Sequence, residues 1–161
     1  MLPEEVAKFI GKTTGVSVFE IEKEPIRRFA DAVDDPNPLY WDEEYAKKSS
    51  YGSIIAPPGF ISIPWCSRPK GGETSPDSRT ELRDALRKVG YVNPGGIDAG
   101  IEYEFFNPVR AGDTITATSM IKDIIEREGK TGKMAFVFNE TTYTNQNGDL
   151  VARARSTFIQ R

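Results

Sequence analysis

The sequence predicts an α+β fold in which a curved antiparallel sheet wraps around a central helix. Two observations lead to this fold class. From residue 100 onward, four β-rich segments follow one another with only short turn signals between them, which is typical of an antiparallel meander. The most apolar stretch of the chain, residues 54–65, precedes this meander. A sheet with one apolar face needs a covering layer, and this stretch is suited to supply it as a buried helix.

The N-terminal part of the chain alternates between short helices and a strand. A short helix is expected over residues 3–10, because Pro3 suits a first turn and Gly11 follows the end. Residues 15–21 alternate in polarity and are rich in β-forming residues, which indicates a strand. Residues 24–33 place their apolar side chains on one helical face.

A rigid loop and the start of the buried helix come next. Residues 34–40 contain two prolines, two aspartates and an asparagine, a composition that predicts a turn. Residues 42–48 are expected to form a short helix with Asp42 as its N-cap. The pair Pro57-Pro58 predicts that the buried helix begins at Pro58, because proline is tolerated in a first turn.

Residues 66–96 differ in character from the rest of the chain. They are rich in charged residues, glycine, proline and serine, and residues 76–89 form the one amphipathic helical pattern among them. We interpret this segment as an insertion over the surface, and long segments of this kind are more often functional or interface-forming than idle. Since no stretch has the composition of a linker, residues 1–161 are expected to form a single domain.

The meander is predicted to contain four strands. Turn residues separate the segments, and Asn147-Gly148 is a strong hairpin signal. Because an exposed sheet edge is normally paired or covered, we expect a dimer that continues the sheet. The expected strands are residues 100–106, 113–126, 133–145 and 150–160.

Composition excludes several classes of function. The net charge is −3 and no stretch is strongly basic, so nucleic acid is not an expected partner. No apolar run is long enough to cross a membrane, and the first residues lack a signal-peptide pattern. A cytoplasmic protein is therefore expected. The single cysteine, Cys66, is interpreted as a small apolar filler and not as a nucleophile.

The chain of 161 residues contains no histidine. Its absence removes Ser-His-Asp and Cys-His nucleophilic schemes, imidazole bases and His-ligated zinc. Catalysis would have to use carboxylates, tyrosines, lysines or backbone dipoles, or a histidine supplied by another chain. No metal site and no cofactor are expected.

Two segments resemble a known family. Residues 29–40 read Phe-Ala-Asp-Ala-Val-Asp-Asp-Pro-Asn-Pro-Leu-Tyr, and residues 51–60 read Tyr-Gly-Ser-Ile-Ile-Ala-Pro-Pro-Gly-Phe. Together with residues 95–105 and 108–113 they resemble the MaoC-like, R-specific enoyl-CoA hydratase/dehydratase family, above all its N-terminal dehydratase-type half. The resemblance covers nearly the whole chain. It implies a hot-dog fold, dimers or double hot dogs, and hydration of a 2-enoyl thioester.

The family motif, Asp-x-Asn-Pro-x-His, pairs an aspartate with a histidine that activates water. By resemblance, Asp35 falls on the catalytic aspartate, Asn37 on the motif asparagine and Tyr40 on the histidine. Tyr40 is the departure, because a phenol with a pKa near about 10 is a poor general base. From the residues alone, the favoured interpretation of Asp35 and Asn37 is as turn residues, and that of Tyr40 is as a packing or lining group.

The segment around Pro58, Gly59 and Phe60 is the expected substrate-binding part of the site. By resemblance, amides at the helix start polarise the thioester carbonyl, and proline leaves only Gly59 and Phe60 able to donate. A rigid helix start is the alternative interpretation, and it does not exclude the first.

Three hypotheses for function follow. The leading one is a histidine-less subunit that shapes the substrate site of an enoyl-thioester hydratase, or 3-hydroxyacyl-thioester dehydratase, together with a catalytic hot-dog chain. The second is a homodimeric protein that binds an acyl thioester without hydrating it. In the third, Asp35 and Tyr40 perform a slower reaction themselves. The expected ligand is an acyl-CoA or acyl-carrier thioester.

Overall fold

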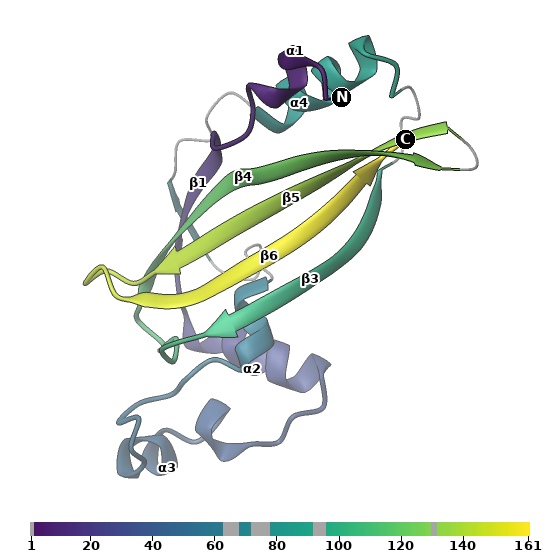
Figure 1. Cartoon of the computed structure of the whole chain (residues 1–161). Coiled ribbons are helices and arrows are strands. Elements are labelled where there is room, and N and C mark those ends of the chain that lie inside the picture. Colours follow the sequence, from purple (N-terminus) through teal and green to yellow (C-terminus); the bar gives the residue numbers. More distant parts are fainter. Residues whose placement is uncertain (1, 63–67, 72–77, 92–95, 130–131) are drawn as a thin grey trace.

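The computed structural model describes residues 2–62, 68–71, 78–91, 96–129 and 132–161 (Figure 1). These residues form a six-stranded, wholly antiparallel sheet in the order β2-β1-β4-β5-β6-β3. Its strands are β1 (Thr13–Glu20), β2 (Arg68–Gly71), β3 (Ile97–Phe105), β4 (Thr114–Gly129), β5 (Gly132–Thr144) and β6 (Leu150–Gln160). The helical elements are α1 (Glu4–Ala7), α2 (Lys23–Ala32), η1 (Pro38–Tyr40), α3 (Glu43–Lys48), η2 (Pro58–Ser62) and α4 (Ser78–Lys88), of which η1 and η2 are 3₁₀ turns. The predicted α+β hot-dog fold is confirmed.

The meander carries the sheet, as the sequence predicts. Strands β4 and β5 form the longest pair, and β6 follows β5 through the turn at Asn147-Gly148, where Gly148 has a φ of +84°. On β5, Ala135 and Val137 are buried, while the intervening Phe136 lies on the opposite face by strand alternation. One face of the sheet is therefore covered by helices and the other faces outward (Figure 1).

The N-terminal segments agree with the predicted elements except at their ends. The helix expected over residues 3–10 is α-helical only over Glu4–Ala7 and continues as a turn. Helix α3 has the expected N-cap, because the Asp42 carboxylate accepts hydrogen bonds from the Glu44 and Tyr45 amides. The buried helix expected from Pro58 begins as the 3₁₀ turn η2, while residues 63–67, including Cys66, lie outside the described part of the chain.

The segment predicted as a surface insertion also belongs to the fold. Residues 68–71 form β2, an unpredicted edge strand that pairs with β1. Helix α4, expected over residues 76–89, packs with α1 at one end of the sheet (Figure 1). The helix buries Leu82 and Leu86 in one apolar cluster with residues of β4 and β5. Helix α4 therefore covers the sheet with its apolar face, and the interpretation of residues 66–96 as an insertion stays a prediction.

Tyr91 fixes the end of this segment to the sheet. Its ring is buried in the same cluster as Leu86, and its hydroxyl donates a hydrogen bond to the Glu126 carboxylate on β4. Burial is the largest cause that raises the pKa of Tyr91, and the bond to Glu126 adds to it. The hydroxyl therefore keeps its proton and remains the donor.

Replacing Leu86 by alanine tests whether α4 is part of the core. Leu86 is 2% exposed, so Leu86→Ala should lower the free energy of unfolding by about 2–5 kcal/mol, the usual cost of truncating a buried leucine. Urea denaturation measures the change. The matched control is the neighbouring exposed Arg87→Ala, expected to change stability by less than about 0.5 kcal/mol. Equal effects of both variants would contradict a core role for α4.

Candidate functional site

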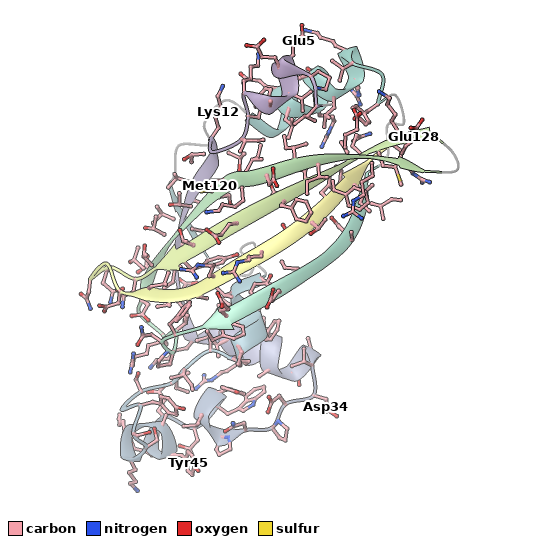
Figure 2. All side chains as sticks on the ribbon, viewed as in Figure 1. Glu5, Lys12, Asp34, Tyr45, Met120 and Glu128 are labelled. Carbon is pink, nitrogen blue, oxygen red and sulfur yellow. The ribbon has the colours of Figure 1, made fainter. Side chains whose placement is uncertain are left out.

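Two consecutive Asx turns shape the loop between α2 and η1. Asp34 follows the C-cap of α2 and has a φ of +54°, and Figure 2 shows its side chain projecting away from the sheet. The Asp35 carboxylate then accepts a hydrogen bond from the backbone amide of Asn37 at 3.1 Å. In turn, the Asn37 side-chain oxygen accepts from the Leu39 amide at 3.1 Å and caps η1. The turn interpretation of Asp35 and Asn37 therefore describes real contacts in this loop.

Tyr40 lies at the end of η1 with its ring in the larger apolar cluster, and it is 7% exposed. Burial is the largest cause that raises the pKa of its hydroxyl, and the negative charge of Asp35 raises it further. A hydrogen bond from the Asn37 side chain acts in the opposite direction. Because the net direction is upward, the phenol stays protonated at neutral pH and is suited to donate a hydrogen bond, not to remove a proton.

Residues 54–57 lie between η1 and the loop that enters β4. The Ala56 amide donates to the Val109 carbonyl at 2.8 Å, and the Ala111 amide donates to the Ile54 carbonyl at 3.1 Å. The Ile55 amide donates to the Leu39 carbonyl at 3.3 Å. These bonds join three segments that are distant in sequence, and they set the position of Pro57 and Pro58 relative to Tyr40.

The 3₁₀ turn η2 is held by aromatic packing. Phe60 is buried and meets Phe29 edge to face, with ring centroids 5.8 Å apart. A Cβ atom added to Gly59 would lie 3.2 Å from the Phe29 ring, so glycine permits this close approach. The Phe60 amide donates to the Pro57 carbonyl at 2.9 Å. Of the two amides that could polarise a carbonyl, the Phe60 amide is therefore already engaged.

A cavity of about 340 Å³ lies between η1, residues 55–58 and the end of β3. The predicted site residues Asn37, Tyr40 and Pro58 are brought together in its lining. Gly59 and Phe60 follow Pro58 in the sequence but are not among the residues that line the cavity. The Phe60 side chain is instead buried in the larger apolar cluster. Asp35 borders a different hollow, together with Asp31, Asp34 and Trp41.

Sequence reasoning did not assign most of the residues that line this cavity, and three of those residues are aromatic. Tyr51 lies in its lining and is near enough to affect the pKa of Tyr40. Phe105 and Phe106, at the end of the edge strand β3, also contribute to the lining, and each is about half exposed. Tyr51 begins the second motif segment, residues 51–60, but only the folded chain brings that segment beside the end of β3.

Comparison with known protein families shows the family to which this chain belongs. The model of the family described as "FAS1-like, dehydratase domain region" matches residues 8–154. The chain belongs to this family. It is a MaoC-like hot-dog dehydratase domain, as its motifs predict. A UPF0336 protein of Streptomyces avermitilis is 36% identical over 72% of this chain and 71% of that relative.

Two solved structures of complexes have the same fold. The ChsH1–ChsH2 complex from Mycobacterium tuberculosis contains a chain with a TM-score of 0.79 and 18% identity, covering 98% of this chain and 89% of that one. The C-terminally truncated HadBC complex of the same organism, a 3R-hydroxyacyl-ACP dehydratase, contains one with a TM-score of 0.64 and 26% identity. That match covers 92% of this chain and 96% of the HadBC chain.

Among the described residues, no helix has both the length and the apolar character that a membrane span needs.

Alkaline titration tests the protonation state of Tyr40. The tyrosinate absorbance of the native chain, minus that of Tyr40→Phe, should show one ionisation above the ordinary tyrosine pKa of about 10, because burial and Asp35 oppose the phenolate. Since the folded pKa is raised, the stability contributed by the neutral phenol is fully present below the ordinary pKa and is lost as the pH rises through the folded one. A difference signal that appears below the ordinary value would contradict the raised pKa.

Proposed function

We propose that this chain is the histidine-less, substrate-shaping subunit of an enoyl-thioester hydratase, or 3-hydroxyacyl-thioester dehydratase. In that reaction, water adds its hydroxyl group to C3 and a proton to C2 of a trans-2-enoyl thioester, and the reverse reaction eliminates the same water. A second MaoC-like chain would supply the aspartate and histidine. Both structural relatives above are complexes of two different subunits, which supports a hetero-oligomer.

The observation that carries this proposal is the exposed apolar edge strand beside the cavity. Ile101 and Phe105 point to the same face of the sheet as the buried Ala152 and Ala154 of β6, yet they are 57% and 49% exposed. An unpaired apolar edge is a site for strand pairing with another chain. Since Phe105 also lines the cavity, a chain bound along β3 would complete the cavity wall.

The chemistry of the cavity also favours a partner with a histidine. The family position of the base is occupied by Tyr40, whose pKa is raised. Asp35 is engaged by the Asn37 amide and borders a different hollow. Removing a general acid–base group costs about 10²–10⁴ in rate, so Asp35 and Tyr40 are poorly placed to act as the catalytic pair themselves.

A second candidate function is a homodimer that binds an acyl thioester without hydrating it. The edge of β3 supports this alternative as well, because a second copy could pair along it as readily as a different chain. Oligomeric state and activity together distinguish the two.

Hydration of 2-enoyl-CoAs, followed by loss of the enoyl absorbance, tests the proposed function. The pure chain should give no rate above background, and addition of a histidine-bearing MaoC-like chain from the same host should restore it. Asp35→Ala in this chain should change the rate of the assembly less than about threefold, whereas loss of the partner's histidine should lower it about 10²–10⁴-fold. A rate of the pure chain that Asp35→Ala abolishes would show instead that the chain is an enzyme in its own right.

Charge placed on the edge strand tests the interface. Ile101→Glu and Phe105→Glu should each prevent assembly with the partner chain, because an unpaired carboxylate would be buried beside apolar residues. The matched control is Ile125→Glu, because Ile125 is exposed on the opposite face of the sheet. Analytical ultracentrifugation measures the assembly. A stable homodimer of the native chain that does not bind the partner chain would favour the second candidate. If Ile125→Glu reduced assembly as much as Ile101→Glu and Phe105→Glu, the edge-strand interface would be refuted.

A further inference from the structure

A second cavity, of about 270 Å³, lies between helix α4 and the covered face of the sheet. None of the described residues that line it also lines the cavity beside Tyr40. Its volume is just below the usual range of about 300–1,000 Å³ for ligand pockets, so an occupant must be small. The apolar part of its wall comes from α4, β4, β5 and β6, through Leu82, Leu86, Ile121, Val137 and Phe158. The cavity therefore suits a small ligand with an apolar body.

Two neutral polar side chains belong to the sheet side of this cavity. Asn139 on β5 and Ser156 on β6 are directly opposite each other in the strand register, and both line the cavity. The Cβ atoms of such a pair lie about 4.5–5.5 Å apart, so one oxygen atom of a ligand can contact both side chains. Among the residues that the structure describes, neither side chain has a hydrogen-bond partner. Both are therefore available to a ligand.

The remaining polar groups of the cavity are engaged or exposed. Gln160 is buried, and its side-chain NH₂ group donates to the Arg161 carbonyl at 3.4 Å. Arg83 and Asp98 are exposed, so solvent screens their charges, and because the charges are opposite they give the lining no net charge. The hydrogen-bonding capacity that is free inside the cavity therefore belongs to Asn139 and Ser156.

The chemistry of this pair selects among ligands. Asn139 and Ser156 each combine a donor with an acceptor, so a hydroxyl or a carbonyl oxygen finds partners there. An ionised group beside them would lose its hydration without an opposite charge next to it. A ligand with many hydroxyls is also unfavourable, because the apolar wall offers those hydroxyls no hydrogen bonds. The lining thus favours an apolar body that carries a single neutral oxygen.

We propose that the cavity under α4 is a binding site for a small alcohol or ketone, whose oxygen contacts Asn139 and Ser156 and whose hydrocarbon part packs against α4 and Phe158. This site goes beyond the proposed hydratase function, since it needs neither the partner chain nor the cavity beside Tyr40. Leu86, which anchors α4 to the sheet, belongs to the same wall. An occupant therefore contacts both the helix and the sheet that it covers.

Nuclear magnetic resonance titration of the purified chain with cyclohexanol tests the proposal. Cyclohexanol combines an apolar ring with one hydroxyl, and myo-inositol is the matched probe with a hydroxyl on every ring carbon. Cyclohexanol should bind saturably and shift the backbone amides of α4 and of residues 137–139 and 156–160. Binding of myo-inositol should be at least about tenfold weaker, because its hydroxyls would be buried without partners. No saturable shift, equal affinity for both probes, or shifts confined to the residues around Tyr40 would overturn the proposal.

Side-chain substitutions locate the hydrogen bonds. Ser156→Ala removes one oxygen atom and no bond within the described chain, so it does not threaten folding, and it should weaken cyclohexanol binding about three- to tenfold. Asn139→Leu keeps the size of the side chain and should have an effect of the same size. The matched control is Thr157→Val, because Thr157 follows Ser156 on β6 and lies on the opposite face of the sheet.

The control should leave the affinity for cyclohexanol unchanged. If both cavity variants bound cyclohexanol as tightly as the native chain, or if Thr157→Val weakened binding as much as Ser156→Ala, the assigned contacts would be wrong.

Discussion

The candidate site depends on the backbone bonds that hold residues 54–57 between two other segments. Two amide–carbonyl bonds join this strip to residues 109–111, and a third joins it to Leu39. Because all three are backbone bonds, they fix relative positions with little dependence on side-chain identity. The strip can therefore present Pro57 and Pro58 to the cavity in the same way whether a catalytic residue or Tyr40 occupies the end of η1.

Tyr40 illustrates how this loop keeps its shape without a histidine at the motif position. Its ring is packed in the same apolar cluster as Ile55 and Phe60, so the phenol contributes buried area. The loop before it is maintained by the Asx turns of Asp35 and Asn37, which need only side-chain oxygens and no proton transfer. The shape of this loop thus does not depend on acid–base chemistry, as the proposed role beside a catalytic partner requires.

Much of the fold could be predicted from the sequence, because its signals are local. Strand alternation on β5 and the Asn147-Gly148 turn need only neighbouring residues. Strand β2 could not be predicted, because its four residues, Arg68–Gly71, have no apolar alternation and are ordered by pairing with β1. The packing of α4 on the sheet could not be located from the sequence, because the amphipathic pattern of residues 76–89 predicts an apolar face, which includes Leu86, but not the surface that this face covers.

Only those residues of the site that belong to a recognisable family motif could be predicted from the sequence. Asn37, Tyr40 and Pro58 are linked by their resemblance to the family motifs alone, and the cavity brings them together. Tyr51 and Phe105 lie within segments that resemble the family, but the sequence did not show that they line the cavity, because only the folded chain brings the end of β3 beside residues 51–58. Phe105 belongs both to this wall and to the exposed edge. A chain that pairs along β3, as proposed, would contact a side chain of the cavity wall, so the proposal predicts that assembly and ligand binding influence each other at Phe105.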